Sequence, residues 1–391
     1  MKALVLVDGE HYAPVVRDAL AALPYEVVGA LLVGGTEKLS GGEDYGVELV
    51  DSLGAVEADV VVDMSDEPVL GPRERMLWAS RVLALGLPYV GADFRFDPPP
   101  FHELDVPSLA VIGLGKRVGK TAVAGHVAAL LARERRVVVV AMGRGGPAEP
   151  EVVSEPPSVE ELVALARAGR HAASDHLETA ALAGVPTVGC RRAGGGLAGA
   201  TLDSNVLEGA RAAAALEPQL LLFDGSGAAL PPVAADARIL VANGSHDVRA
   251  GLNAYRVLIS DLVVDTGGLD RDAIRELTDA PIVGVELRLE PAEPLAGRRT
   301  AVFTTGPAPT AHLDGEVVHV SRNLARRDLL REELEHVDAE VFLVELKAAA
   351  IDVVAEAALA RGAEVVLARN AVRSDELDAR VLELAREAAR A

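Results

Sequence analysis

Short apolar runs alternate with segments of helical periodicity along almost the whole chain. The runs at residues 137–142 and 220–223 are continuously aliphatic, which is typical of strands buried on both faces of a parallel sheet. In segments such as residues 122–133 the apolar positions instead recur at helical spacing. Because strands that alternate with helices form βαβ units, the pattern predicts an α/β fold with parallel sheets.

The alternation divides into three segments. A proline-rich stretch at residues 97–107 interrupts it, and a further set of strands begins near Arg298. We therefore expect an N-terminal Rossmann-like α/β domain at 1–100, a central domain at 107–295 and a small C-terminal α/β domain at 296–391. Strands are predicted at 3–7, 27–33, 60–64, 108–112, 137–142, 220–223, 239–242, 262–264, 281–286, 300–303, 317–320, 341–344 and 365–367. Helices are predicted at 12–22, 73–85, 122–133, 159–168, 323–335, 348–361 and 375–390.

A glycine loop with a Gly-Lys-Thr ending joins the first strand of the central domain to its first helix. Backbone N–H groups of such a loop wrap a polyphosphate at the positive end of the helix. Lys120 would reach the β- and γ-phosphates, and the Thr121 hydroxyl would hold Mg²⁺. A glycine-rich turn without a ligand is the alternative, but strand, loop and helix agree. We predict a P-loop NTPase-like central domain that binds ATP or GTP through Gly113, Gly115, Lys116, Arg117, Gly119, Lys120 and Thr121.

The spacing of this loop departs from the common pattern G-x-x-x-x-G-K-[ST]. That pattern would put glycine at position 114, where the chain has Leu114, and the count from Gly113 to Gly119 is one residue longer. The longer loop resembles the dethiobiotin-synthetase-like branch of P-loop proteins.

The chain is strongly acidic, with 38 Lys and Arg residues against 59 Asp and Glu residues and a formal net charge of −21. Such a chain is expected to repel nucleic acid and anionic membranes, so we predict neither as a partner. An anionic substrate would need cations gathered locally against this field. The single cysteine, Cys190, excludes a disulfide within the chain, and no apolar run approaches the ~18 residues of a membrane span. We therefore predict a cytoplasmic protein.

Polar residues that follow the central strands indicate how a metal ion and a phosphate are bound. Asp224 ends an aliphatic strand, where a carboxylate is the expected Mg²⁺ partner of a P-loop, although Asp-Gly is also a common turn. Arg144 follows another buried strand, and Arg191 and Arg192 precede a run of glycines. Guanidinium groups suit phosphate oxygens, so we predict phosphate binding, with solvated turns as the alternative. Cys190 has no identifiable partner and is expected to be a buried bystander.

Histidines and a few further cations complete the candidates. His171 and His176 suit neither one helix face nor a known zinc spacing, and substrate binding and a structural role both stay open for them. In the N-terminal segment, clusters that contain His11 and Lys38 follow successive strands, at the edge where α/β sheets bind ligands. Ordinary loops with helix caps are the alternative there.

The C-terminal segment adds two cations at strand ends, Arg322 and Lys347. Lys347 is one of only five lysines in the chain, which favours a specific role, although a solvated lysine at a helix start is nearly as good an interpretation.

Ten stretches spread over nearly the whole chain carry a more specific signal: VDGEHY (7–12), VGGTEKL (33–39), MSDEP (64–68), GADFRF (91–96), GKRVGKTAV (115–123), VAMGRGGP (140–147), HAASDH (171–176), VGCRRAGGG (188–196), GSGAALPPV (225–233) and ELKAAAIDV (345–353). Only the P-loop among them is generic, and their joint order resembles the cyclic 2,3-diphosphoglycerate synthetase family. The resemblance implies that ATP and 2,3-diphosphoglycerate give cyclic 2,3-diphosphoglycerate, ADP and phosphate. It implies ATP and Mg²⁺ as cofactors, and we expect a homodimer.

The resemblance also implies roles for the candidate residues. Catalytic roles are expected for Lys120, Arg144, Arg191, Arg192 and Lys347. Substrate binding is expected for His11, Lys38, His171, His176 and Arg322. Mg²⁺ binding is expected for Thr121 and Asp224.

Two other functions remain open at this stage. The first is another ATP-dependent ligase or kinase that acts on a phosphorylated small acid. The second is a nucleotide-switched regulator or metallochaperone. A single cysteine argues against a metallochaperone, and a switch would need fewer cations that face a substrate.

Overall fold

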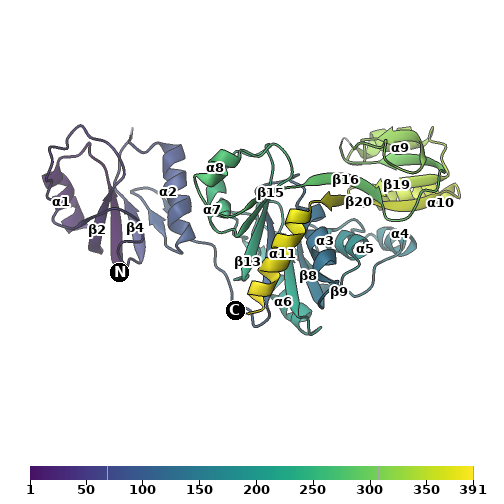
Figure 1. Cartoon of the computed structure of the whole chain (residues 1–391), viewed down its shortest axis with the longest axis horizontal. Helices are drawn as coiled ribbons and strands as arrows, with labels where there is room; N and C mark the ends of the chain where they lie inside the picture. Colours follow the sequence, from purple (N-terminus) through teal and green to yellow (C-terminus); the bar gives the residue numbers. More distant parts are fainter. Residues whose placement is uncertain (68, 307, 391) are drawn as a thin grey trace. The chain divides into compact units, whose positions relative to one another are not determined.

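The computed structural model describes residues 1–67, 69–306 and 308–390 (Figure 1). By their contacts these residues form two compact units. Unit 1 comprises Met1–Pro100, His246–Ile259 and Asp270–Asp279, and unit 2 comprises Phe101–Ser245, Ser260–Leu269 and Ala280–Ala391. The three-domain division of the sequence stays a prediction.

Unit 1 is built on one mainly parallel sheet. Its strands are β1 (Lys2–Val7), β2 (Glu26–Leu32), β3 (Leu49–Val50), β4 (Val60–Asp63), β5 (Tyr89–Val90) and β6 (Arg95–Phe96), and its helices are α1 (Ala13–Ala22), α2 (Pro72–Ala84), α7 (Asn253–Leu258) and α8 (Arg271–Arg275). The strand order is β3-β2-β1-β4-β5-β6, and only the pairing of β5 with β6 is antiparallel. From β1 the strand order runs outward in both directions, through β2 to β3 on one side and through β4 to β6 on the other. The carboxyl ends of β1 and β4 therefore flank the point where the strand order reverses, which is where such sheets bind ligands.

The P-loop sheet forms the larger part of unit 2. Its strands are β7 (Ser108–Gly113), β8 (Val137–Gly143), β9 (Glu151–Val153), β10 (Thr187–Ala193), β11 (Asp203–Ser204), β12 (Leu220–Asp224), β13 (Ala237–Ala242), β14 (Leu262–Asp265) and β15 (Ile282–Gly284). The helices α3 (Lys120–Leu131), α4 (Val159–Arg167), α5 (Asp175–Ala183) and α6 (Val206–Ala214) connect them. The order is β11-β10-β8-β12-β7-β13-β14-β15, so β7 ends in the middle of the carboxyl edge. The strands from β10 to β15 in this order are parallel, as the aliphatic runs predict.

A second, smaller sheet also belongs to unit 2. It contains β16 (Glu286–Pro291), β17 (Arg299–Phe303), β18 (Glu316–Ser321), β19 (Val341–Glu345) and β20 (Glu364–Arg373) in the order β16-β20-β19-β17-β18. The helices α9 (Arg327–Leu334) and α10 (Glu356–Ala360), the π-helical turn η1 (Ala350–Ala355) and α11 (Asp375–Ala388) follow its strands.

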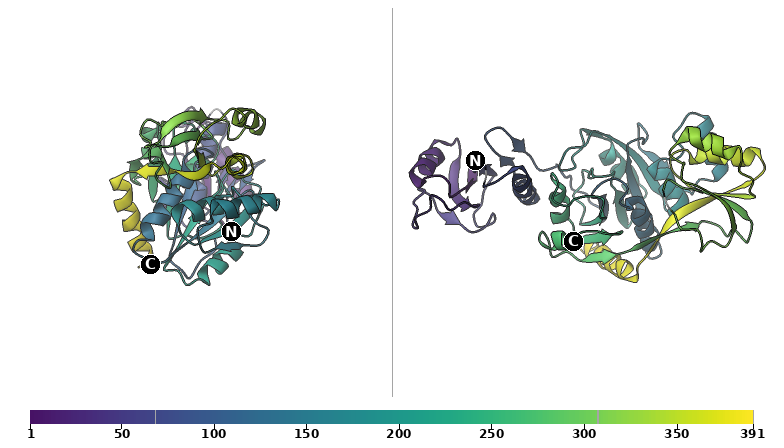
Figure 2. Two further views of the ribbon diagram at one scale, coloured as in Figure 1. Left: turned by 90° about the vertical axis from the view of Figure 1, so that its right-hand side faces the viewer. Right: turned by 90° about the horizontal axis from the view of Figure 1, so that it is seen from above.

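Helix α11 packs on the P-loop sheet, although the sequence pattern assigns it to the C-terminal domain (Figures 1 and 2). Leu377, Val381 and Ala385 share one hydrophobic core with Leu109 and Val111 of β7. The apolar stripe of α11 therefore completes the core that supports the P-loop. The α/β class with parallel sheets and a P-loop domain is confirmed.

The departures from the predicted elements have local causes. Residues 143–157, for which the sequence predicts no strand, contain β9, which pairs antiparallel with β10. The glycine-rich stretch at 188–196 begins inside β10, which places Arg191 and Arg192 on a strand. The strand predicted at 281–286 divides into β15 and β16, which belong to different sheets. The helix predicted at 348–361 divides into η1 and α10.

Candidate active site

The P-loop lies at the carboxyl end of β7 and leads directly into α3. Gly119 has a φ angle of +83°, a backbone conformation that favours glycine, and a Cβ at this position would also lie 2.7 Å from Cδ1 of Leu287. Leu114, which replaces the first glycine of the common pattern, is buried, and its N–H donates to the carbonyl of Val241 (3.0 Å). The unusual residue therefore anchors the longer loop in the core.

Lys120 and Asp224 form a buried ion pair at the start of α3. The Nζ of Lys120 contacts Oδ1 of Asp224 at the end of β12, and the two side chains are 9% and 1% exposed. Burial raises the pKa of Asp224 to about 6, although the charge of Lys120 opposes the shift. The other oxygen, Oδ2, is buried and has no hydrogen-bond partner among the described residues.

A cavity of about 520 Å³ opens in front of the P-loop and is lined by residues of both sheets of unit 2. Among the predicted site residues it contains Gly115, Lys116, Arg117, Gly119, Lys120, Thr121, Arg144, His171, His176 and Lys347. Cations that are far apart in the sequence thus line one cavity, in a chain whose net charge is −21.

Asp175, the first residue of α5, lines the same cavity but is not singled out by the sequence. Burial is the main reason that the pKa of Asp224 is raised, and the negative charge of Asp175 adds to the shift, so the two carboxylates lie close enough to interact. A carboxylate in the first turn of a helix is also common for reasons of helix stability. That is why the sequence alone does not identify Asp175.

The three predicted arginines do not lie together in the cavity. Arg144 lines it, and its positive charge adds to the effect of burial in lowering the pKa of Arg192. Arg192 donates through Nη2 to the carbonyl of Ser226 (2.9 Å) and through Nη1 to that of Gly194 (2.7 Å). Arg191 is exposed, as it lies in the last part of β10, where the buried pattern of the strand ends. Neither Arg191 nor Arg192 is among the described residues that line the cavity.

Both predicted histidines of unit 2 reach the cavity. His176 is buried, its Nδ1 lies 3.1 Å from Oγ of Ser174, and burial lowers its pKa. Its Nε2 has no hydrogen-bond partner within the described ranges. Oε2 of Glu151 lies 3.9 Å from this nitrogen. A neutral imidazole whose Nε2 has no hydrogen bond can bind a ligand, but the substrate role of His171 and His176 stays a prediction.

Lys347 lies two residues after the end of β19 and lines the cavity from the smaller sheet. Its Nζ is 3.7 Å from Oε1 of the buried Glu178 on α5. The negative charge of Glu178 raises the pKa of Lys347, which keeps the ammonium group charged. Burial raises the pKa of Glu178 to about 7, although Lys347 opposes the shift. Glu178 is a second residue that the sequence does not single out, since an acid inside a helix is ordinarily solvated.

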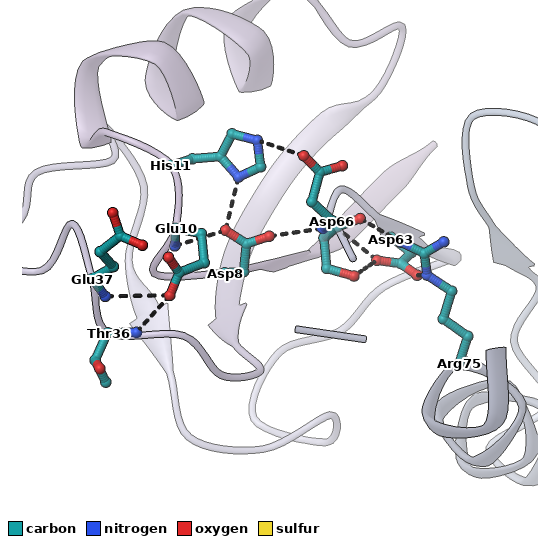
Figure 3. A network of polar contacts seen from close by, with 9 residues as sticks. Asp8, Glu10, His11, Thr36, Glu37, Asp63, Asp66 and Arg75 are labelled. Atoms are coloured by element: carbon teal, nitrogen blue, oxygen red, sulfur yellow. Dashed lines mark hydrogen bonds and ion pairs between the residues drawn. The ribbon is translucent and has the colours of Figure 1, made fainter. Parts of the chain in front are cut away.

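His11 belongs to a polar network in unit 1, at the carboxyl end of β1 (Figure 3). Asp8 is 1% exposed and accepts hydrogen bonds from the backbone N–H groups of Glu10 (2.9 Å) and Asp66 (2.7 Å) and from Nδ1 of His11 (2.7 Å). The second ring nitrogen of His11 lies 3.4 Å from Oδ2 of Asp66. Burial alone would raise the pKa of Asp8, but these hydrogen bonds hold it below its ordinary value.

A second carboxylate of this network, that of Asp63, also has protein partners (Figure 3). Asp63, at the end of β4, accepts hydrogen bonds from the N–H of Ser65 (2.9 Å) and the hydroxyl of Tyr89 (2.6 Å), and it lies 3.3 Å from Nε of Arg75.

Lys38 lies on the same side of unit 1 and is likewise paired. Its Nζ contacts Glu37 and lies 5.7 Å from the centre of the Tyr12 ring. Glu10 accepts hydrogen bonds from the N–H groups of Thr36 (3.0 Å) and Glu37 (3.2 Å). Carboxylates therefore surround His11 and Lys38, and their substrate role stays a prediction.

Three further predicted residues lie outside the cavity lining: Asp224, which is buried against Lys120, Arg322 and Gly113. Arg322 is exposed directly after β18. Gly113 ends β7, where a Cβ would lie 2.7 Å from the carbonyl oxygen of Gly227, so this glycine allows two loops to approach closely.

The cavity offers a modest set of donors for a metal ion. Within residues 1–67, 69–306 and 308–390, no group of three or more His, Cys, Asp or Glu side chains is arranged to hold one. Nucleotide-bound Mg²⁺ commonly takes only one or two carboxylates and completes its shell with phosphates and water. Thr121 lines the cavity, and Asp224 lies just behind the lining, paired with Lys120; the hydroxyl of Thr121 and the unpartnered Oδ2 of Asp224 fit this requirement.

Comparison with protein families covers most of the chain. Three family models match: the cyclic 2,3-diphosphoglycerate synthetase N-terminal domain at residues 2–97, its P-loop domain at 108–279 and its C-terminal domain at 291–371. The chain belongs to the cyclic 2,3-diphosphoglycerate synthetase family. The resemblance predicted from the sequence is confirmed, as is an enzyme with a nucleotide-binding P-loop domain.

Individual relatives in the cyclic 2,3-diphosphoglycerate synthetase family match over full length. The synthetase of Rubrobacter xylanophilus is 47% identical and aligns with 100% of this chain and 98% of its own. That of Thermococcus onnurineus is 40% identical over 98% of both chains. Among solved structures, LpxK from Aquifex aeolicus in complex with ATP aligns with a TM-score of 0.45 at 17% identity, over 73% of this chain and 90% of that chain. Every helix in the described part of this chain is too short or too polar to span a bilayer.

Proposed function

We propose that this chain uses ATP to convert 2,3-diphosphoglycerate into cyclic 2,3-diphosphoglycerate, with release of ADP and phosphate. The observation that carries the proposal is the cavity around the P-loop. Lys116, Lys120, Arg144 and Lys347 line it together, although the chain as a whole is strongly acidic. Two polyanions that must react with each other need such a local excess of positive charge.

The P-loop binds the triphosphate of ATP through its backbone N–H groups. Lys120 exchanges its contact with Asp224 for the β- and γ-phosphates, which frees both oxygens of that carboxylate. Thr121 and Asp224 are the residues that would hold Mg²⁺, which neutralises charge on the β- and γ-phosphates when it is bound.

The reaction proceeds in two displacements. In the first, an oxygen of one substrate phosphate attacks the γ-phosphorus, and the bond to the bridging oxygen breaks to release ADP. In the second, an oxygen of the neighbouring substrate phosphate attacks the activated phosphorus, and the transferred group leaves as inorganic phosphate. The product is an intramolecular phosphoanhydride, and atoms balance with one ATP consumed for each ring closed.

The protein contributes position and charge to these steps. Arg144 stands at the end of β8, beside the loop 225–227, and is exposed toward the cavity. Lys347 approaches from the smaller sheet with its charge maintained by Glu178. Cations from both sheets can thus contact phosphates that belong to different molecules.

ATP turnover with and without 2,3-diphosphoglycerate tests the proposal. We expect ADP formation only with the acid present, and a ³¹P NMR spectrum that shows one cyclic product for each ADP. Rapid-quench analysis with γ-labelled ATP should find label attached to the substrate before ring closure. Turnover that does not depend on the acid, or none at all, would contradict the proposal.

Another ATP-dependent ligase or kinase is the second candidate, because the cavity alone does not define the acceptor. The same experiment separates the two, since a kinase would leave the γ-phosphate on the product. A homodimer, a cytoplasmic location and the absence of a nucleic-acid partner stay predictions, and light scattering would test the first.

A further inference from the structure

A second cavity lies beside the first, between α3, α5 and β20 of unit 2. Its volume is about 230 Å³. The face of α3 that borders it carries small residues, including Gly125 and Ala129, and no atom lies within 4 Å of a Cβ placed at Gly125. The space is therefore open along the helix and is not filled by neighbouring side chains.

The charges of this second cavity are unbalanced. Four basic side chains line it, against two carboxylates: Lys347, Arg133, Arg369 and Arg373 against Glu178 and Glu290. His126 of α3 also lines this cavity, but its Nε2 lies 2.6 Å from Oδ1 of Asp378 on α11 and is therefore already paired.

The two arginines of β20 share one partner. The carboxylate of Glu290 contacts Nη2 of Arg373 and lies 3.6 Å from Nη2 of Arg369. The arginine side chains are 52% and 59% exposed, for Arg369 and Arg373 respectively, so their remaining N–H groups are accessible. Since one carboxylate neutralises only one guanidinium group, this pair keeps a net positive charge that suits a phosphate or carboxylate.

Four residues line both cavities: Thr121, Ala122, Lys347 and Asn370. Thr121 is the P-loop threonine, so a ligand in the second cavity lies next to the predicted position of the γ-phosphate. Lys347 is held at this junction by the buried Glu178 (3.7 Å). Asn370 is held there by Glu345, which accepts a hydrogen bond from its Nδ2 (2.9 Å). The junction is thus built from fixed polar groups.

We propose that the second cavity is the subsite for the phosphorylated acid, with its distal anionic groups at Arg369 and Arg373 and its reacting phosphate at Lys347. Glu178 acts as a positioning residue that holds Lys347 between the two ligands. This inference rests on the proposed function and adds the place where the acceptor binds. It assigns that place to unit 2 alone.

Steady-state kinetics of the double variant Arg369→Gln/Arg373→Gln test the assignment. We expect the KM for 2,3-diphosphoglycerate to rise about 10-fold or more, because charge-assisted hydrogen bonds are lost, while the KM for ATP stays within about twofold. Arg380→Gln is the matched control, since Arg380 is an exposed arginine of α11 that pairs with Glu383 (3.0 Å) outside both cavities. It should leave both constants unchanged.

A cavity-filling variant, Gly125→Leu, gives a second and independent test. Leucine is favoured over glycine inside a helix, so the fold should be kept, while the side chain would occupy the space over position 125. The KM for the acid should rise again with that for ATP unchanged. Unchanged KM values for the acid in both variants, or an equal rise in the KM for ATP, would overturn the assignment.

Direct titration of the wild type and both variants with 2,3-diphosphoglycerate separates this inference from the proposed function. If the wild type binds the acid but forms no cyclic product, the proposed function fails, and the variants still report whether binding occurs in this cavity.

Discussion

Two sheet edges of this chain have the same kind of sequence but differ in how their polar groups are satisfied. In unit 1, Asp8 and Asp63 follow parallel strands and accept hydrogen bonds from neighbouring protein groups (Figure 3). In unit 2, Asp224 follows a parallel strand, but one of its oxygens has no partner among the described residues. An unpartnered buried carboxylate oxygen beside a cavity indicates a ligand site, whereas carboxylates whose two oxygens both accept hydrogen bonds, as in Asp8 and Asp63, indicate a structural role.

The signs of the pKa shifts follow the same division. Hydrogen bonds overcome burial at Asp8 and hold its pKa below the ordinary value, so its carboxylate stabilises the fold when charged. Burial dominates at Asp224 and Glu178 and raises their pKa values to about 6 and about 7. Charged Asp224 and Glu178 therefore carry a cost in the absence of ligand, which the neighbouring Lys120 and Lys347 oppose only in part.

The largest effect is expected for Lys120→Ala. Loss of the P-loop ammonium should lower kcat by about 100- to 1,000-fold, because the charge that develops on the β- and γ-phosphates loses a stabilising partner. Lys2→Ala is the control, since Lys2 is an exposed lysine of unit 1 that is 3.4 Å from Glu57. Equal activities of the two variants, measured by ADP release, would remove the basis for placing the reaction in unit 2.

A smaller loss of activity is expected for Glu178→Gln. The amide keeps the shape but not the charge that fixes Lys347, so kcat should fall about 10-fold with the KM for ATP unchanged. A purely structural role would instead lower the thermal midpoint without changing kcat for the folded fraction. Lys347→Gln should lower kcat at least as much. If the losses of kcat add in the double variant Glu178→Gln/Lys347→Gln, the two residues do not act through a shared role.

The pH dependence of stability should differ between wild type and Glu178→Gln. The pKa of Glu178 is raised from 4.5 to about 7, so this group contributes stability that is present below pH 4.5 and is lost as the pH rises to about 7. Thermal midpoints measured between pH 4.5 and 7 without ligand should fall less steeply in the variant. A steeper fall in the variant would show that the buried carboxylate is not destabilising.

The network of unit 1 predicts an effect on stability with little effect on catalysis. Asp8→Ala leaves the N–H groups of Glu10 and Asp66 without their acceptor, and we expect a loss of about 2 kcal/mol in the free energy of unfolding. Because the pKa of Asp8 is lowered, its contribution is present above the ordinary value of 3.8 and is lost as the pH falls through the pKa in the folded protein. Denaturant unfolding at pH 7 and at pH 3 would show the difference between variant and wild type shrinking in acid.

The smallest effect is expected for His11→Gln. Both ring nitrogens of His11 face carboxylates, at 2.7 and 3.4 Å, so the surroundings disfavour an anionic ligand. The KM for 2,3-diphosphoglycerate should therefore change by no more than about twofold, as for substitutions away from a binding site. A large rise would support the substrate role that the sequence predicts.

The sequence predicts the fold class and the P-loop well, because both depend on local patterns. Aliphatic runs identify buried strands, and the spacing of Gly119, Lys120 and Thr121 identifies the loop. It does not predict that α11 packs on the P-loop sheet, because an apolar stripe shows that a helix is buried but not which sheet it covers.

Candidate site residues are predicted only where a motif carries them. Arg144 and Lys347 line the cavity, whereas Arg191 is exposed and is not among the described residues of its lining, and the catalytic roles of all three stay predictions. Asp175 and Glu178 are missed, since an acid in a helix becomes informative only when its burial and its partners are known.

The central claim is that the acidic substrate binds beside the P-loop in unit 2 and not at the strand-end network of unit 1. Calorimetric titration of 2,3-diphosphoglycerate, with a non-hydrolysable ATP analogue and Mg²⁺ present, tests it directly on three proteins: wild type, His11→Gln and Arg369→Gln/Arg373→Gln. We predict that wild type and His11→Gln bind the acid alike and that the double arginine variant binds it about 10-fold more weakly or not at all. Loss of binding in His11→Gln with unchanged binding in the arginine variant would contradict the claim.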